Sequence, residues 1–144
     1  MKQTIKMNEQ TYAIRMREDI ETFLNESNCL HDGYILSVQF SHNGYKPQKD
    51  GSVHAYPEDN ELKIRILITS IWNTVIELIF KEVSEWQVHD NMWDIFGTAI
   101  SVSESGKIVW TDSFSTDEEI RKKGSYVVAR SMEYRFCDKC AKRN

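Results

Sequence analysis

Three residues that can bind metals or transfer protons stand within a few positions of one another near the N-terminus: Cys29, His31 and Asp32. They lie in the stretch NCLHDGYILSV, just before an alternating apolar run. A thiolate, an imidazole and a carboxylate can ligate a metal or carry acid–base chemistry. The same residues also fit a simpler interpretation, in which Asp32 and Gly33 turn the chain and His31 caps or packs beside the turn.

A second thiol pair, Cys137 and Cys140, lies at the C-terminus with CxxC spacing. In redox proteins such a pair normally opens a helix, which lowers the pKa of the thiol. Here the pair follows an expected strand, which disfavours a thioredoxin-type role. Zinc is the better alternative, because a tetrahedral site needs four N or S ligands and Cys29 and His31 would complete the set. The competing interpretation is a polar tail with free thiols.

Other catalytic patterns are weak. Two His-Asp dipeptides occur, His31-Asp32 and His89-Asp90, but the chain has only four histidines, and all lie near expected turns or strand ends. Turn chemistry explains both dipeptides. Glu77 and Glu82 would suit acid–base work in a cleft, although alternating carboxylates on a strand are more often inert. The chain contains no Gly-x-Ser-x-Gly, phosphate-loop or dinucleotide motif.

Composition indicates one globular domain. The chain has 144 residues, 40% of them hydrophobic and 28% charged, with a formal net charge of −4. The acidic balance disfavours nucleic acid as a partner. No apolar run is long enough to span a membrane, and no signal peptide is visible, so we expect a cytoplasmic protein. We expect a single domain over residues 1–136 and a polar tail over 137–144.

The first elements follow from hydrophobic spacing. Met16, Ile20, Phe23 and Leu24 form one apolar face of a helix over residues 14–26. After Gly33 the period becomes two. The next strand is therefore expected to turn four side chains to one face: Tyr34, Leu36, Val38 and Phe40.

A long polar connection follows, over residues 41–60, and contains Tyr45 and Tyr56. Connections of this length are uncommon without structure of their own. Alternating strands are then predicted over residues 62–69 and 75–81. Their polar face is expected to be wet at least in part; it carries Lys63, Arg65, Glu77 and Lys81.

The C-terminal half predicts more strands. Residues 93–102 are β-rich, with a bulge allowed at Gly97, and a tight turn leads into a hairpin partner over 108–111. Residues 116–123 fit a short helix with capping residues and complementary charges. The last strand, over 126–136, is expected to face one side through Tyr126, Val128, Met132, Tyr134 and Phe136. Arg130 interrupts that face, which suggests a strand end or a site.

One helix followed by about six or seven strands with short connections leaves little room for parallel crossovers. We therefore predict an α+β fold, with a curled or partly closed antiparallel meander and the N-terminal helix against one face. Exposed aromatic side chains would be its anchors for a protein partner. The candidates are Trp72, Trp86, Tyr45 and Tyr56.

Four stretches, FLNESNCLHDGYILSVQF, LKIRILI, VIELIFKEV and YVVARSMEYRF, together resemble a group of small bacterial proteins. His31, Asp32 and Gly33 match that group's Leu-His-Asp-Gly start of the first strand, and Leu78, Phe80 and Val83 match its core strand. Some members resemble immunity proteins of polymorphic toxin systems, which neutralise a toxin by binding it. The resemblance implies that His31-Asp32-Gly33 is a corner that sets the first strand's register.

Three functions remain open from the sequence. The first is a protein-binding module, of the immunity type, whose acidic charge suits a basic toxin. The second is a small-ligand binder or enzyme with a cleft near His31 and Asp32, joined by Arg130, Tyr134 and Glu77. The third is a structural zinc protein. The absence of catalytic motifs favours a non-enzymatic role.

Overall fold

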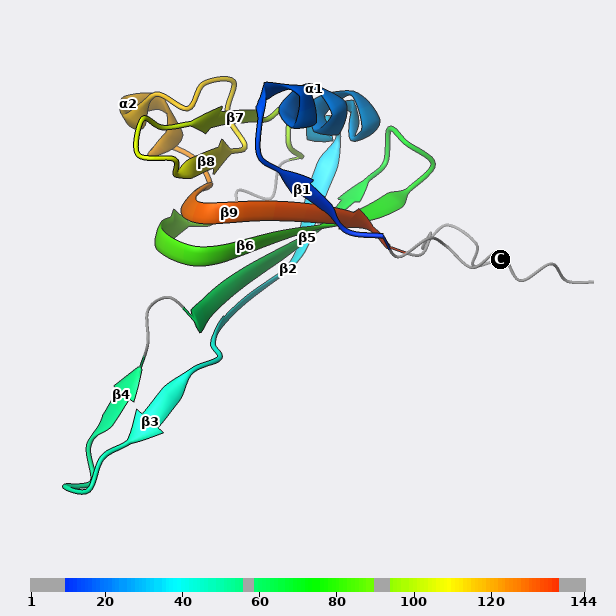
Figure 1. Cartoon of the computed structure of the whole chain (residues 1–144). Helices are drawn as coiled ribbons and strands as arrows, with labels where there is room; N and C mark the ends of the chain where they lie inside the picture. The colour runs from blue at the N-terminus through cyan, green and yellow to red at the C-terminus, as the bar shows by residue number, and fades with distance from the viewer. Residues whose placement is uncertain (1–9, 56–58, 90–93, 138–144) are drawn as a thin grey trace, which may run out of the picture.

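The structure is a computed structural model that describes residues 10–55, 59–89 and 94–137. A seven-stranded antiparallel sheet dominates it, and one helix packs on a face of that sheet (Figure 1). The predicted α+β class is therefore confirmed. In chain order the elements are β1 (Tyr12–Ile14), α1 (Arg17–Glu26), the 3-10 turn η1 (Asn28–Leu30), β2 (Gly33–His42), β3 (Tyr45–Pro47), β4 (Val53–Ala55), β5 (Asn60–Ile68), β6 (Thr74–Gln87), β7 (Ala99–Val102), β8 (Ile108–Thr111), α2 (Glu118–Arg121) and β9 (Tyr126–Phe136).

Helix α1 begins three residues later than its apolar spacing suggests. Ile14 is the last residue of β1 and pairs with Met132 of β9. A carboxylate oxygen of Asp19 accepts the backbone N–H groups of Arg15, at 2.9 Å, and Met16, at 3.1 Å. These bonds satisfy donors ahead of the first helical turn, so the helix starts at Arg17.

The main sheet has the strand order β2-β5-β6-β9-β8-β7, and β1 pairs with the C-terminal half of β9. Strands β2, β5 and β6 are neighbours in the sheet, with the β3–β4 hairpin in the connection between β2 and β5, and β9 returns to pair with β6 after the β7–β8 hairpin. The sheet is curled but not closed. A single bridge between Gly33 and Ile95 joins the start of β2 to the segment that precedes β7.

The core fills the inner face of the sheet, which we define as the face that packs on α1. The predicted alternation of β5 is confirmed, because Leu62, Ile64, Ile66 and Ile68 are all fully buried. Helix α1 contributes Phe23, whose ring meets Tyr134 edge-on with centroids 4.9 Å apart. None of the described helices combines the length and apolar character that crossing a bilayer requires.

Strand β2 contains a bulge at Leu36, where its register with β5 shifts between Ile35 and Ser37. The extra residue reverses which side chains face inward. The prediction that Tyr34 and Leu36 share the inner face with Val38 was therefore wrong. Tyr34 and Leu36 are exposed, and Ile35 packs on the core instead.

The alternation of inward and outward side chains also shifts where β6 and β9 bend. Glu82 has a φ of 51°, and the buried pair Phe80–Met132 is followed by the pair Val83–Ala129. On each strand two residues, and not the usual one, thus separate successive side chains that point inward. The prediction that Tyr126 and Val128 share a face with Met132 and Tyr134 was wrong for this reason. Their neighbours Val127 and Ala129 join the core cluster instead.

Arg130 lies at this bend and does not end the strand. Its side chain is exposed, and its Nε lies 3.4 Å from a carboxylate oxygen of Glu82. The buried side chain of Asn60 holds the bend from the other side: its amide nitrogen donates to the carbonyl of Val83 at 2.9 Å, and its amide oxygen accepts from the N–H of Val83 at 2.6 Å. The interruption of the apolar face of β9 at Arg130 therefore marks a bend and an ion pair.

The outer face of the sheet is only partly wet. Lys63, Arg65 and Lys81 keep partial exposure, but Glu77 is 5% exposed, which corrects the expectation for that residue. The Nε of Arg135 lies 3.0 Å from one carboxylate oxygen of Glu77, and the Nε of Arg65 lies 3.9 Å from the other. A buried carboxylate needs such compensation.

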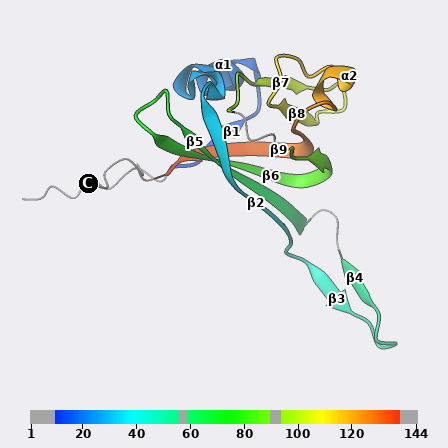
Figure 2. The ribbon, with the colours of Figure 1, turned by 180° about the vertical axis from the view of Figure 1, so that it is seen from behind.

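The long polar connection forms a separate hairpin, β3–β4, which we call the arm. The arm projects away from the body of the protein in both views (Figures 1 and 2). A backbone bond from Asn43 N–H to the carbonyl of Asp59, at 2.9 Å, closes its base. The connection thus has structure of its own, as its length predicts.

The C-terminal hairpin and short helix agree with the sequence. Strands β7 and β8 pair as expected, and the Asp117 carboxylate caps α2 by accepting the N–H of Glu119 at 3.0 Å. The strand expected from Trp93 begins only at Ala99, and Trp93 lies outside the described residues. At Gly97 a Cβ would lie 2.7 Å from a ring carbon of Phe114, so the glycine admits that ring.

Candidate functional site

The stretch His31-Asp32-Gly33 is a corner that binds three segments together. The backbone N–H of Asp32 donates to the carbonyl of Ile95 at 2.8 Å, and its carbonyl accepts from the N–H of Thr69 at 3.2 Å. Ser70 Oγ donates to the carbonyl of His31 at 2.7 Å, and His31 Nδ1 lies 2.8 Å from the carbonyl oxygen of Phe96. These contacts support the simpler interpretation of the dipeptide as a turn.

The four residues of the zinc hypothesis are not seen together. Cys29 is exposed in η1, while Cys137 is half-buried beyond the end of β9, and Cys140 lies outside the described residues. Within the described residues no three His, Cys, Asp or Glu side chains are placed to hold a metal ion. Burial raises the pKa of the Cys137 thiol, which is the opposite of what a redox thiol needs.

The polar residues proposed to join His31 and Asp32 in a cleft are dispersed. Glu77 lies on the outer face with Arg135, and Arg130 is exposed beside Glu82. Tyr134 is fully buried in the core, where burial raises its pKa to about 12. Glu77 and Glu82 each pair with arginine, so they do not form an acid–base pair with one another.

The predicted interaction residues lie in three different places. Trp72 is 82% exposed in the turn between β5 and β6, and Tyr45 is exposed in the arm. Trp86 stacks on the ring of Phe40 with centroids 5.5 Å apart, so it also covers the inner face. Tyr56 lies outside the described residues.

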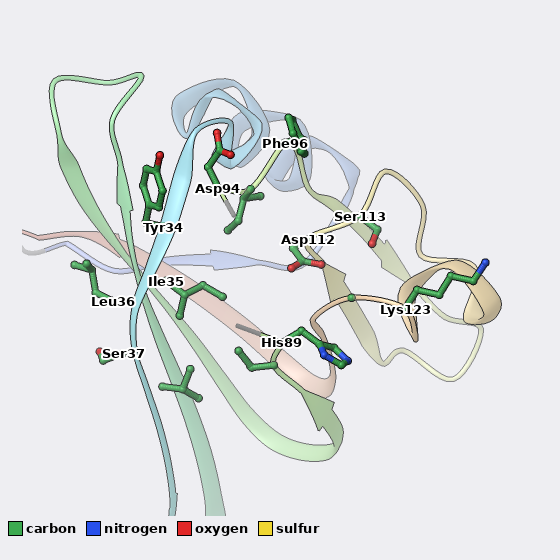
Figure 3. Close-up of a pocket in the computed structure, with 14 residues that line it drawn as sticks. Tyr34, Ile35, Leu36, Ser37, His89, Asp94, Phe96, Asp112, Ser113 and Lys123 are labelled. Carbon is green, nitrogen blue, oxygen red and sulfur yellow. The ribbon is translucent and has the colours of Figure 1, made fainter. Parts of the chain in front are cut away.

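A cleft lies beside β2 and adjoins the corner at His31 and Asp32, where one was predicted, but neither of these residues lines it. Its volume is about 600 Å³. Residues 34–38 of β2 form one wall, and four other segments complete it (Figure 3). These segments contribute Val88, His89, Asp94, Ile95, Phe96, Asp112, Ser113, Lys123 and Gly124.

Apolar and acidic groups share the cleft. Phe96 is exposed at one end of it, whereas Tyr34 and Leu36, which are also exposed, line it from β2 and point to the far side of that strand, away from Asp112 (Figure 3). Ile35 and Asp112 approach it from opposite walls, while the side chain of Lys123 extends away from Asp112 (Figure 3). With the bulge at Leu36, Tyr34 and Leu36 turn outward and Ile35 points toward the cleft (Figure 3).

Asp112 is fixed at the end of β8 by two bonds with Ser125. Its backbone N–H donates to the Ser125 carbonyl at 3.1 Å, and its carboxylate oxygen accepts the Ser125 N–H at 2.8 Å. A Cβ on Gly124 would lie 2.6 Å from that oxygen, so glycine is required for the approach. Burial raises the pKa of Asp112 above its ordinary value, although the Ser125 bonds act against that rise.

His89 forms the neighbouring part of the same wall. Its backbone N–H donates to Ser125 Oγ at 2.9 Å, and its Nε2 lies 2.8 Å from the amide nitrogen of Gln87. That amide nitrogen also donates to the carbonyl of Gly124 at 3.0 Å. Gln87 therefore ties the end of β6 to the Gly124 turn, and the imidazole is held as part of this wall.

The arrangement suits binding better than catalysis. The half-buried carboxylate of Asp112 can accept a cation, and Ile35 on the opposite wall can pack against the apolar stem of that cation (Figure 3). The only sequence feature that could have indicated Asp112 as a site residue is its position, as a polar residue directly after the fully buried strand β8. No family model, curated protein or solved structure matches the chain.

Proposed function

We propose that this is a cytoplasmic protein-binding module of the immunity type, which neutralises a toxin by direct binding through the cleft beside β2. The observation that carries the proposal is the cleft in which Ile35 and the carboxylate of Asp112 face each other, with the exposed side chains of Tyr34, Leu36 and Phe96 on the adjoining surface (Figure 3). Exposed aromatic and apolar side chains next to a partly desolvated polar group are typical of protein interfaces.

Two sequence features support the same function. The resemblance to immunity-type proteins rests in part on His31-Asp32-Gly33, the corner from which β2 enters the cleft wall. The formal net charge of −4 suits a basic partner such as a nuclease toxin, because opposite charges speed association. Binding requires no catalytic constellation.

Binding to the toxin encoded beside the gene tests this proposal. Calorimetry should show one-to-one binding to the wild-type protein, and the toxin's activity should fall in proportion to the complex formed. The double variant Tyr34→Ala with Phe96→Ala should weaken binding at least about a hundredfold, since hot-spot truncations cost on the order of 2 kcal/mol each.

Two further variants locate the interface. Val102→Ala removes an exposed apolar side chain of β7 outside the cleft and should bind the toxin like the wild type. Trp72→Ala tests the turn between β5 and β6 as an alternative surface. A toxin that fails to bind the wild-type protein would refute the function, and a loss confined to Trp72→Ala would move the interface away from the cleft.

A second candidate function is the binding of a small cationic ligand in the same cleft. Its volume of about 600 Å³ lies within the usual range for small-molecule sites. Burial raises the pKa of Asp112, although the Ser125 bonds and the charge of His89 act against that rise. Thermal unfolding with millimolar arginine, spermidine or choline tests this candidate, which requires a rise in Tm that the variant Asp112→Asn abolishes.

A further inference from the structure

Strand β2 presents an open edge to the cleft. It pairs only with β5, and its other edge makes one described bridge, at Gly33. Within the described residues, the backbone hydrogen bonds of residues 34–42 go to β5 alone. Residues 34–38 of this open edge also line the cleft. An unpaired strand edge is a template on which another extended chain can form hydrogen bonds.

The cleft wall opposite this edge carries the carboxylate of Asp112, which is in no described ion pair. Asp94 also lines the cleft, but it lies beside the start of β2 (Figure 3). Lys123 is the lining residue with a basic side chain other than His89, and it extends away from Asp112 (Figure 3). A cation that entered from β2 would therefore meet the carboxylate of Asp112 directly.

We propose that the partner contributes an extended basic segment that adds a strand to the open edge of β2 and places a lysine or arginine side chain against Asp112. This inference rests on the proposed function and names the chemistry of the partner. Main-chain bonds to β2 supply the docking register, and alternate side chains of the segment enter the cleft. Ile35, which faces Asp112 across the cleft (Figure 3), packs against the aliphatic stem of the basic side chain.

A synthetic peptide probes the inferred contact without the partner. The Lys probe is a blocked peptide of alternating threonine and valine with one central lysine. Matched probes carry norleucine or glutamate at the centre. The Lys probe should shift the NMR amide signals of residues 34–38, and norleucine or the variant Asp112→Asn should weaken its binding about tenfold. Glu104→Gln, in the turn between β7 and β8, is the control and should bind as the wild type does.

Backbone pairing has a separate readout. The Lys probe is prepared with N-methyl groups on its odd residues or on its even residues. A strand on β2 directs only alternate N–H groups toward the protein, so one methylated set should abolish binding and the other should preserve it. Equal effects of the two sets, or absence of binding by the Lys probe at millimolar concentration, would overturn the inference.

The toxin experiment separates this inference from the proposed function. A toxin that binds the wild type and Asp112→Asn equally well leaves the function intact and overturns the basic contact. A toxin that does not bind the wild-type protein refutes the function itself. Tight binding of the glutamate probe at β2 would also overturn the contact, because like charges at Asp112 should repel.

Discussion

Gly33 is the residue on which the corner and the start of β2 depend. A Cβ at this position would lie 2.7 Å from the carbonyl oxygen of Leu30 and 2.9 Å from a methyl carbon of Ile66. Its backbone also forms the bridge to Ile95 that joins the two ends of the curled sheet. The close approach therefore has a direct structural purpose, and it explains why glycine follows His31-Asp32.

The substitution Gly33→Ala should destabilise the protein by about 2 kcal/mol, because neither the Leu30 carbonyl nor the buried Ile66 can move without disturbing its neighbours. Urea unfolding followed by circular dichroism measures the change. Ser37→Ala, at an exposed position of the same strand, serves as the control and should stay within about 0.5 kcal/mol of the wild type. An unchanged midpoint for Gly33→Ala would show that the corner tolerates a side chain.

Asp112 gives a second prediction, which concerns pH. Its pKa is raised in the native state, so the native protein holds this proton more tightly than the unfolded chain does. The stability that Asp112 contributes is therefore fully present below its unfolded pKa and is lost as the pH rises through its native pKa. An asparagine side chain at this position cannot titrate, yet its amide oxygen can still accept the Ser125 N–H.

The variant Asp112→Asn should consequently gain stability relative to the wild type as the pH rises from about 3 to about 7. Unfolding free energies of both proteins across this range measure the difference. The control is Glu104→Gln in the turn between β7 and β8. A difference that is constant with pH, or that changes in the opposite direction, would contradict the assigned role of burial.

At the scale of elements, regular strands were predictable and irregular ones were not. The alternation of Leu62, Ile64, Ile66 and Ile68 gave the correct inner face of β5, because that strand has a paired neighbour on each side and no bulge. The bulge at Leu36 has no compositional signature, so a period of two extended through it assigns Tyr34 to the wrong face.

The residues that line the cleft were unpredictable for a related reason. Its walls come from segments as far apart in sequence as Ile35 and Asp112, and they meet because β9 pairs with both β6 and β8. Local periodicity identifies a strand but does not specify its distant neighbours. The corner at His31-Asp32-Gly33 was predictable because its turn chemistry is contained in adjacent residues.

The arm is the element least integrated with the rest of the molecule. Deletion of residues 45–59 would join Asn43-Gly44 to Asn60 and leave the pair His42–Asn60 connected by a two-residue Asn-Gly loop. Because such loops favour hairpins, the free energy of unfolding of the shortened protein should lie within about 1 kcal/mol of the wild-type value. Thermal and urea unfolding measure this, and a loss of cooperative unfolding would show that the arm supports the core.

The same deletion tests Tyr45 and Tyr56 as interaction residues, since it removes both. Toxin binding that survives the deletion would assign recognition to the body of the protein and the cleft. Toxin binding that disappears while the fold persists would assign recognition to the arm. Gly51→Ser, at the exposed tip of the arm, gives a full-length comparison whose local change leaves both tyrosines in place.

At the scale of the whole molecule, charge acts at two ranges. The proposed contact at the half-buried Asp112 would affect how long a basic partner stays bound, whereas the net charge of −4 would affect how often the partner arrives. Salt separates these effects, because the Debye length falls from about 10 Å at 0.1 M to about 3 Å at 1 M. Long-range attraction is screened over this range, while a desolvated contact is screened much less.

We therefore expect the association rate of a basic toxin to fall at least about tenfold between roughly 0.02 M and 0.5 M NaCl, with a smaller change in the dissociation rate. Stopped-flow mixing measures both. Glu104→Lys, in an exposed turn outside the cleft, should slow association and leave dissociation unchanged, because it alters only the field. Asp112→Asn should mainly speed dissociation. If instead Glu104→Lys sped dissociation and Asp112→Asn changed only association, the contact would lie at the β7–β8 turn and not in the cleft.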